Sequence, residues 1–170
     1  MERHLWLIGM MGSGKTATAG ALGARWGVDV VDTDAEVATR TGCSIAQLWG
    51  ERGEAAFREI ESAMIQRLKD RSPAVIGTGG GVVLDAANVV AMRTSGRVVW
   101  LGAEPAVLSA RVGDGSKRPL LNVDSSEERL GEILRERTTL YAAAAHLVVD
   151  TTEITVEATV DRIEEWWNTS

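Results

Sequence analysis

Residues 9–16 of the chain read GMMGSGKT, and the rest of the sequence is understood most easily from this stretch. It matches G-x-x-x-x-G-K-[ST] at every fixed position and follows directly after the apolar run 5–8. The pattern predicts a strand, a glycine-rich turn and then a helix over 17–26. Backbone N–H groups of such a turn, at the positive end of a helix, bind phosphate oxygens.

Two side chains that close this motif complete a nucleotide site. The Lys15 ammonium can reach the β- and γ-phosphates, and the Thr16 hydroxyl can bind a Mg²⁺ ion that bridges them. The residues expected to bind ATP here are Gly12, Ser13, Gly14, Lys15, Thr16 and Ala17. A glycine-rich turn that matches by chance is the alternative, which the position between a strand and a helix disfavours. The motif does not identify the phosphate acceptor.

Composition limits the classes of protein to consider. A length of 170 residues fits a single domain over 1–170. The net charge of −6 argues against a nucleic-acid partner and against a polybasic membrane binder, so the partner is expected to be a small molecule. An anionic substrate would need a local cluster of Arg and Lys. The chain is expected to act as a monomer.

The single cysteine, Cys43, excludes an internal disulfide framework and a multi-cysteine zinc site. It is expected to be a small buried apolar residue. No apolar run approaches membrane-spanning length, and the N-terminus runs straight into the first strand. These features predict a cytoplasmic protein.

Short β-like runs alternate with helical patterns along the whole chain. The predicted strands cover 4–8, 29–31, 74–76, 97–101 and 146–149. Such alternation predicts an α/β fold, with a parallel sheet between two layers of helices. Binding sites in these sheets lie at the carboxyl ends of the strands, so the residues after each run are the candidates. His4 and His146 stand near strand starts, at the opposite end, and receive no catalytic role.

Asp32 and Asp34 follow the second predicted strand. In an extended segment residues i and i+2 point to the same side, so both carboxylates can face the phosphates. One could serve a metal ion and the other the acceptor, and Mg²⁺ would relieve the repulsion between them. Alternatively, one of them caps a helix that starts near Ala35.

The middle of the chain holds two further candidates. A helix is predicted over 54–69, in which Glu61 can hold the guanidinium of Arg58 three residues earlier. Taken alone, this pair is more typical of a solvated surface ion pair. The third strand is followed by Gly79, Gly80 and Gly81, which favour close approach of a ligand to the backbone over a plain flexible turn.

A basic, glycine-hinged segment with a proline follows from Arg111 to Leu121. It is interpreted as part of a mobile lid over about 113–124, whose Lys117 and Arg118 could meet a transferring phosphoryl group. Ordinary solvated loop charges are the alternative. A helix carrying Arg137 is predicted over 127–143, and an amphipathic helix over 155–167.

Together these blocks resemble the shikimate kinases over nearly the whole chain. The matching residues are 12–16, 32–34, 53–54 with Phe57, Arg58 and Glu61, 79–81, 118–121, and Arg137 with Tyr141. The resemblance implies transfer of a phosphoryl group from ATP to the 3-hydroxyl of shikimate, in the pathway to chorismate and the aromatic amino acids. It also implies a five-stranded parallel sheet in the order 2-3-1-4-5, a lid and a substrate-binding helical region over about 33–61.

The same resemblance implies a role for each site residue. Thr16 and Asp32 would serve Mg²⁺, and Lys15, Asp34 and Arg118 would be catalytic. Arg111 and Arg118 would join the ATP site, Arg111 against the adenine. The shikimate-binding residues would be Asp34, Arg58, Gly79, Gly80, Gly81 and Arg137. Trp49 and Phe57, which otherwise read as core, would form an aromatic wall beside the substrate.

Four other functions are compatible with part of the pattern. A gluconate kinase would share the loop and need a carboxylate clamp, but the F-R-x-x-E, G-G-G and R-P-L-L blocks argue against it. A nucleoside monophosphate kinase needs a base-reading segment that we do not find. A guanine-nucleotide switch needs an N-K-x-D element, which the chain lacks. A regulatory module without catalysis would be expected to have lost Lys15, Asp34 or Arg118.

Overall fold

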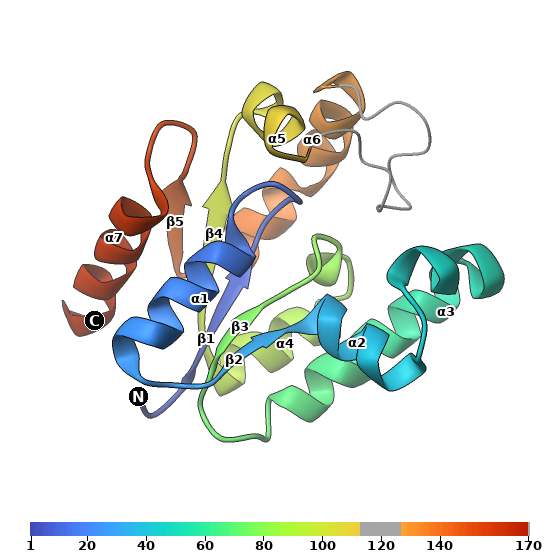
Figure 1. Cartoon of the computed structure of the whole chain (residues 1–170), viewed down its shortest axis with the longest axis horizontal. Coiled ribbons are helices and arrows are strands. Elements are labelled where there is room, and N and C mark those ends of the chain that lie inside the picture. Colours follow the sequence, from blue (N-terminus) through green and yellow to red (C-terminus); the bar gives the residue numbers. More distant parts are fainter. Residues whose placement is uncertain (113–126, 170) are drawn as a thin grey trace.

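The computed structural model describes residues 1–112 and 127–169, and within them five strands form a parallel sheet (Figure 1). The strands run in the order β2-β3-β1-β4-β5, and each neighbouring pair is parallel. Their bounds are β1 His4–Ile8, β2 Val30–Asp32, β3 Val75–Gly77, β4 Gly96–Gly102 and β5 Leu147–Asp150. The predicted fold class and strand order are therefore confirmed, with strand ends that differ from the prediction by one residue.

Helices connect the strands and cover both faces of the sheet (Figure 1). They are α1 Lys15–Trp26, α2 Thr33–Thr41, α3 Ile45–Leu68, α4 Ala86–Ser95, α5 Pro105–Val112, α6 Glu127–Ala144 and α7 Val156–Thr169, with the short 3₁₀ helix η1 Val82–Leu84. No helix in the described part of the chain is long and apolar enough to cross a membrane.

The central strand β1 is fully buried and contributes to two hydrophobic cores. Because side chains alternate along a strand, Leu5 and Leu7 pack into one core with α1 and α7. Trp6 and Ile8 pack into the other, with α3, α4 and α6. The sheet is therefore the middle of three layers. Because its strands are parallel, their carboxyl ends all lie at the same end of the sheet.

Helix α3 begins nine residues before the predicted start at residue 54. Ser44 caps it, since the Ser44 hydroxyl accepts from the N–H of Gln47 while the Gln47 side chain accepts from the N–H of Ser44. The helix is kinked at Gly53, where φ is 78° and ψ is 171°. Glycines at 50 and 53 weaken the helical pattern of the sequence, which explains why the first half was missed.

Two other boundaries differ from the prediction. Helix α5 ends at Val112, so Arg111 lies in its last turn and not in a loop. Helix α4 was not anticipated. Cys43 is half-buried and not fully enclosed, and its thiol donates to the hydroxyl of Thr41.

Candidate active site

Two adjoining cavities lie at the carboxyl ends of the strands, and they share Met11, Asp34 and Gly80. The first, of about 300 Å³, includes all the predicted substrate-binding residues: Asp34, Arg58, Gly79, Gly80, Gly81 and Arg137. We call it the acceptor cavity. The second, of about 400 Å³, includes six predicted nucleotide residues: Gly12, Gly14, Lys15, Thr16, Ala17 and Arg111. We call it the phosphate cavity.

The glycine-rich loop has a backbone that few other residues could adopt. Gly9 and Gly12 have φ values of 137° and 78°. A Cβ on Gly9 would also stand 2.2 Å from the carbonyl oxygen of Leu101. The Lys15 ammonium donates to the carbonyl oxygens of Gly9 and Met10, both at 2.8 Å. The Lys15 side chain and the glycine-rich loop therefore stabilise one another at the N-terminus of α1.

Thr16 and Asp32 lie together in the phosphate cavity. The Thr16 hydroxyl donates to Asp32 Oδ2 at 2.9 Å. The other carboxylate oxygen, Oδ1, accepts from the N–H groups of Asp34 and Ala35 at 3.1 and 3.2 Å, so Asp32 also caps α2. One side chain can thus cap α2 and line the phosphate cavity.

The donor set of this pair fits a magnesium ion. A hydroxyl and a carboxylate are both hard oxygen ligands, which Mg²⁺ prefers. Within the described residues no group of three or more His, Cys, Asp and Glu side chains could hold a metal. Magnesium needs no such cage, because it keeps waters and takes its other ligands from substrate phosphates.

Asp34 reaches the site by a route other than the predicted one. The chain is helical from Thr33 onward, so the argument from extended residues i and i+2 is wrong for Asp34. Its carboxylate leaves the first turn of α2 and lines both cavities. The Thr33 hydroxyl accepts from the N–H of Gly79 at 3.0 Å, which joins this turn to the glycine segment.

Charged side chains pack directly on the segment Gly79–Gly81. A Cβ on Gly79 would stand 2.5 Å from Glu61 Oε1 and 2.9 Å from Asp34 Oδ1. One on Gly81 would stand 2.1 Å from Arg58 Nη1. The glycines therefore make room for the carboxyl and guanidinium groups of the cavity, and flexibility is not needed to explain them.

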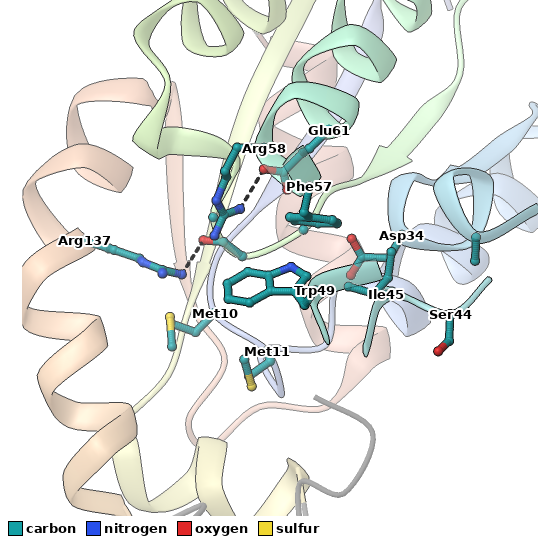
Figure 2. A pocket seen from close by; sticks show the side chains of 14 residues that line it. Met10, Met11, Asp34, Ser44, Ile45, Trp49, Phe57, Arg58, Glu61 and Arg137 are labelled. Carbon is teal, nitrogen blue, oxygen red and sulfur yellow. Dashed lines mark hydrogen bonds and ion pairs between the residues drawn. The ribbon is translucent and has the colours of Figure 1, made fainter. Parts of the chain in front are cut away.

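The guanidinium of Arg58 contacts two carboxylates and lies over two aromatic rings, and Figure 2 shows it beside Glu61, Trp49 and Phe57. Nη1 donates to Glu61 Oε2 at 2.7 Å, while Nε and Nη2 approach Glu54 Oε1 at 3.3 and 3.2 Å. The guanidinium carbon lies 5.6 Å from the ring centroid of Trp49 and 5.3 Å from that of Phe57. A solvated surface ion pair was the alternative interpretation of Arg58 and Glu61. Both residues line the acceptor cavity.

Glu61 is the buried partner in this pair, with 2% of the residue exposed. Burial raises the pKa of Glu61, and the neighbouring Arg58 opposes that rise. Oε1 has no hydrogen-bond partner among the described residues. A buried carboxylate against a guanidinium fixes the arginine more firmly than an exposed one, because solvent does not compete for the contact.

Arg137 enters the acceptor cavity from α6 (Figure 2). It is 5% exposed, and Nη1 donates to the carbonyl oxygen of Gly80 at 3.1 Å. The hydroxyl of Tyr141, one turn further along α6, donates to the same oxygen. Burial raises the pKa of Tyr141 to about 12, which keeps this donor protonated. Two guanidinium groups from α3 and α6 therefore meet over one glycine segment.

Arg111 extends from α5 toward the loop after β5. Its Nη1 and Nη2 donate to the hydroxyl and carbonyl oxygens of Thr151 at 3.2 and 2.7 Å. Both residues line a third cavity of about 290 Å³, which continues from the phosphate cavity along α1 and also includes Ser13 and Ile154. We call it the base-side cavity. The resemblance implies an adenine against Arg111, and Arg111 lines this cavity.

Comparison with known proteins assigns the family. The family model described as shikimate kinase matches residues 11–168. The chain belongs to the shikimate kinase family. A shikimate kinase of Paramagnetospirillum magneticum is 39% identical over 163 residues, which cover 96% of this chain and 83% of the relative. One from Thermosynechococcus vestitus is 40% identical over 162 residues, covering 95% and 88%.

Solved shikimate kinase structures have the same fold. The enzyme of Acinetobacter baumannii, determined in complex with shikimate, superposes with a TM-score of 0.95 at 29% identity, covering 98% of this chain and 93% of that one. The enzyme of Aquifex aeolicus gives a TM-score of 0.83 at 30% identity, covering 97% and 96%.

Several residues of the shikimate kinase site were not predicted. Met10, Met11, Ala38, Ser44 and Ile45 line the acceptor cavity. The two methionines occupy variable positions of the loop motif, and so carry no sequence signal of their own. The capping pattern at Ser44 does signal a helix start. Arg118 and the predicted lid over 113–124 lie outside the described residues.

Proposed function

We propose that this chain transfers the γ-phosphoryl group of ATP to the 3-hydroxyl of shikimate, giving shikimate 3-phosphate and ADP on the route to chorismate. The observation that carries the proposal is the continuity of the two cavities. The acceptor cavity holds two arginines, and it opens onto the phosphate loop at Asp34 and Gly80. A carboxylate held at one end thus leaves a ring hydroxyl near the phosphates at the other.

On the nucleotide side, the residues of the phosphate cavity hold and neutralise the triphosphate. The backbone N–H groups of the loop surround the phosphate oxygens, and Lys15 adds a positive charge beside them. Thr16 would bind Mg²⁺ directly and Asp32 would bind it through water; the hydrogen bond between these two side chains brings both oxygens to one point of the cavity. When bound, the ion neutralises charge that develops on the β- and γ-phosphates.

On the acceptor side, Arg58 and Arg137 bind the shikimate carboxylate. Glycines 79–81 let the ring lie close to the backbone, with Trp49 and Phe57 as the apolar wall. Asp34 orients the hydroxyls of shikimate. It accepts the proton of the 3-hydroxyl while the oxygen of that hydroxyl attacks the γ-phosphorus and ADP leaves. Positioning of the reactants and electrostatic stabilisation account for most of the catalysis, because the transferring group passes through a loose transition state.

Three further assignments remain proposals. Arg118 would neutralise the transferring phosphoryl group from the lid. The chain would act as a monomer without a nucleic-acid or membrane partner. A cytoplasmic location is supported by the single cysteine, which suits a reducing compartment.

The proposal is tested by an ADP-release assay with shikimate, gluconate and nucleoside monophosphates as alternative acceptors. We expect turnover with shikimate alone, and loss of turnover in Lys15→Ala, whose folding is checked by circular dichroism. Preferred use of another acceptor would overturn the substrate assignment. Undiminished turnover of Lys15→Ala would overturn the role of the loop.

A further inference from the structure

Thr151 stands directly after β5, at a point where four segments meet. It is 4% exposed. Its N–H donates to the carbonyl oxygen of Gly102 at 2.8 Å, at the end of β4. Its hydroxyl lies 2.9 Å from that same oxygen and 3.3 Å from the carbonyl oxygen of Ser13 in the phosphate loop. Arg111 of α5 completes the set.

The hydroxyl of Thr151 uses both of its hydrogen-bonding capacities. A hydroxyl has one proton to donate and lone pairs with which to accept. The proton goes to the carbonyl of Gly102 or of Ser13, and a lone pair accepts from Arg111 Nη1. The carbonyl of Thr151 accepts from Nη2 at 2.7 Å. A single residue therefore holds two nitrogens of one guanidinium.

This contact restricts how Arg111 can meet a nucleotide. Hydrogen bonds to guanidinium nitrogens lie in the plane of the group, so its two faces stay available for stacking. Arg111 lines both the phosphate cavity and the base-side cavity. An arginine held along one edge loses little further rotamer entropy when a base stacks on it.

We infer that Thr151 is a positioning residue for nucleotide binding: it orients Arg111 toward the base and ties the base-side loop to the phosphate loop. The inference rests on the proposed function, since it takes the base-side cavity as the place of the adenine. Thr151 acts on the nucleotide through Arg111, while its contact with the backbone of Ser13 fixes the position of Thr151 itself. It does not touch the reacting atoms.

The test compares Thr151→Val with Thr151→Ser. Valine keeps the shape of threonine but can neither donate nor accept, so Arg111 Nη1 loses its partner while Nη2 keeps the backbone carbonyl. We expect the KM for ATP to rise roughly tenfold or more, on the scale of a lost hydrogen bond to a charged group. The KM for shikimate and kcat at saturating ATP should stay within about twofold. Thr151→Ser, which keeps the hydroxyl, should restore the KM for ATP.

Thr152→Val is the matched control. It removes a hydroxyl from the next residue of the same loop, one that accepts from the N–H of Glu104 and does not contact Arg111. We expect its KM for ATP to be that of the unaltered chain. Calorimetric titration with ADP measures nucleotide affinity apart from turnover. The affinities for ADP should rank the variants in the same order as their KM values for ATP.

A double-mutant cycle with Arg111→Ala decides whether Thr151 acts through the arginine. If it does, Thr151→Val adds little to the loss already caused by Arg111→Ala. Independent, additive losses would overturn the inference, as would an unchanged KM for ATP in Thr151→Val or a failure of serine to rescue. If Thr151→Val does not fold, Thr151→Ala compared with Thr151→Ser decides between the same outcomes. Failure of the proposed function would look different, because the unaltered chain would then not phosphorylate shikimate.

Discussion

Arg58 is held in one position by its neighbours in the protein. Glu61 accepts from Nη1, Glu54 accepts from Nε and Nη2, and the guanidinium lies over the neighbouring rings of Trp49 and Phe57. A side chain confined in this way has lost much of its rotamer entropy during folding. Arg137 is confined too, by burial and by its bond to Gly80.

We expect Arg58→Lys and Arg137→Lys each to weaken shikimate binding by about 1–3 kcal/mol, although the charge is kept. A guanidinium presents two parallel donors to a carboxylate, whereas an ammonium is a point charge. Affinity for ATP should hardly change, because neither arginine lines the phosphate cavity. Calorimetric titration with shikimate and, separately, with ADP measures both effects.

Shikimate methyl ester is the matched ligand for these titrations, since it lacks the negative charge. The unaltered chain should bind the acid much more tightly than the ester, and the lysine variants should discriminate less. Equal binding of acid and ester by the unaltered chain would show that no carboxylate clamp exists.

At the scale of the element, the kink in α3 determines where the aromatic wall stands. The first half of the helix carries Trp49 and the second half carries Phe57, yet their ring centroids lie only 5.7 Å apart. Gly53 separates the two halves with a backbone conformation that is essentially restricted to glycine. The direction of the first half, and with it the shape of the acceptor cavity, depends on that residue.

Gly53→Ala should destabilise the protein by about 1–3 kcal/mol and raise the KM for shikimate. No atom stands within 4 Å of the added Cβ, so the cost comes from the backbone and not from a clash. Thermal unfolding followed by circular dichroism, together with steady-state kinetics, measures the two effects.

Gly50→Ala is the control for that change. Gly50 lies in the same helix, has no positive φ and also has open space around its Cβ position. Alanine there should stabilise the protein by about 0.5–1 kcal/mol, because it removes a helix-interior glycine. If both variants behave alike, the kink is not what orients the aromatic wall.

At the scale of the whole molecule, two histidines join neighbouring strands at the end of the sheet away from the site. His4 Nδ1 accepts from the N–H of Ala74, just before β3, at 3.1 Å. His146 Nδ1 accepts from the N–H of Val98 in β4 at 2.9 Å. Burial lowers the pKa of His4, and it lowers that of His146, where Arg93 and Arg97 act in the same direction.

The stability contributed by the two histidines should therefore fall as the pH drops through their ordinary pKa of 6.5. The folded-state pKa of each histidine lies below its ordinary value of 6.5, so the unfolded chain takes up protons first. The stabilisation is present above pH 6.5 and is lost as the pH falls toward the folded-state pKa. Urea unfolding at several pH values measures this dependence.

His4→Asn is the informative variant, because its side-chain oxygen can accept from Ala74 without titrating. We expect a weaker pH dependence than in the unaltered chain. Glu61 contributes with the opposite sign, since its raised pKa lets the folded state take up the proton first. That contribution is common to both proteins and cancels in the difference between them. Identical pH dependence would show that His4 is not the titrating group.

The sequence by itself determined the features that depend on neighbouring residues. The glycine-rich loop, the ion pair of Arg58 with Glu61 and the glycines after β3 are all contained in short stretches. The alternation of strands and helices was equally local, and it was enough to predict the sheet class. Even the cap at Ser44 was present as a local signal, although Gly50 and Gly53 obscured the helix that follows it.

Only the tertiary structure decided which distant groups meet. Arg58 and Arg137 come to the same glycine segment because α3 and α6 pack on one face of the sheet. Thr151 meets Arg111 because β4 and β5 end side by side, which brings the loop after β5 to α5. Periodicity and composition carry no information about such pairs, since their distance depends on how the layers pack and not on any residue nearby in the chain.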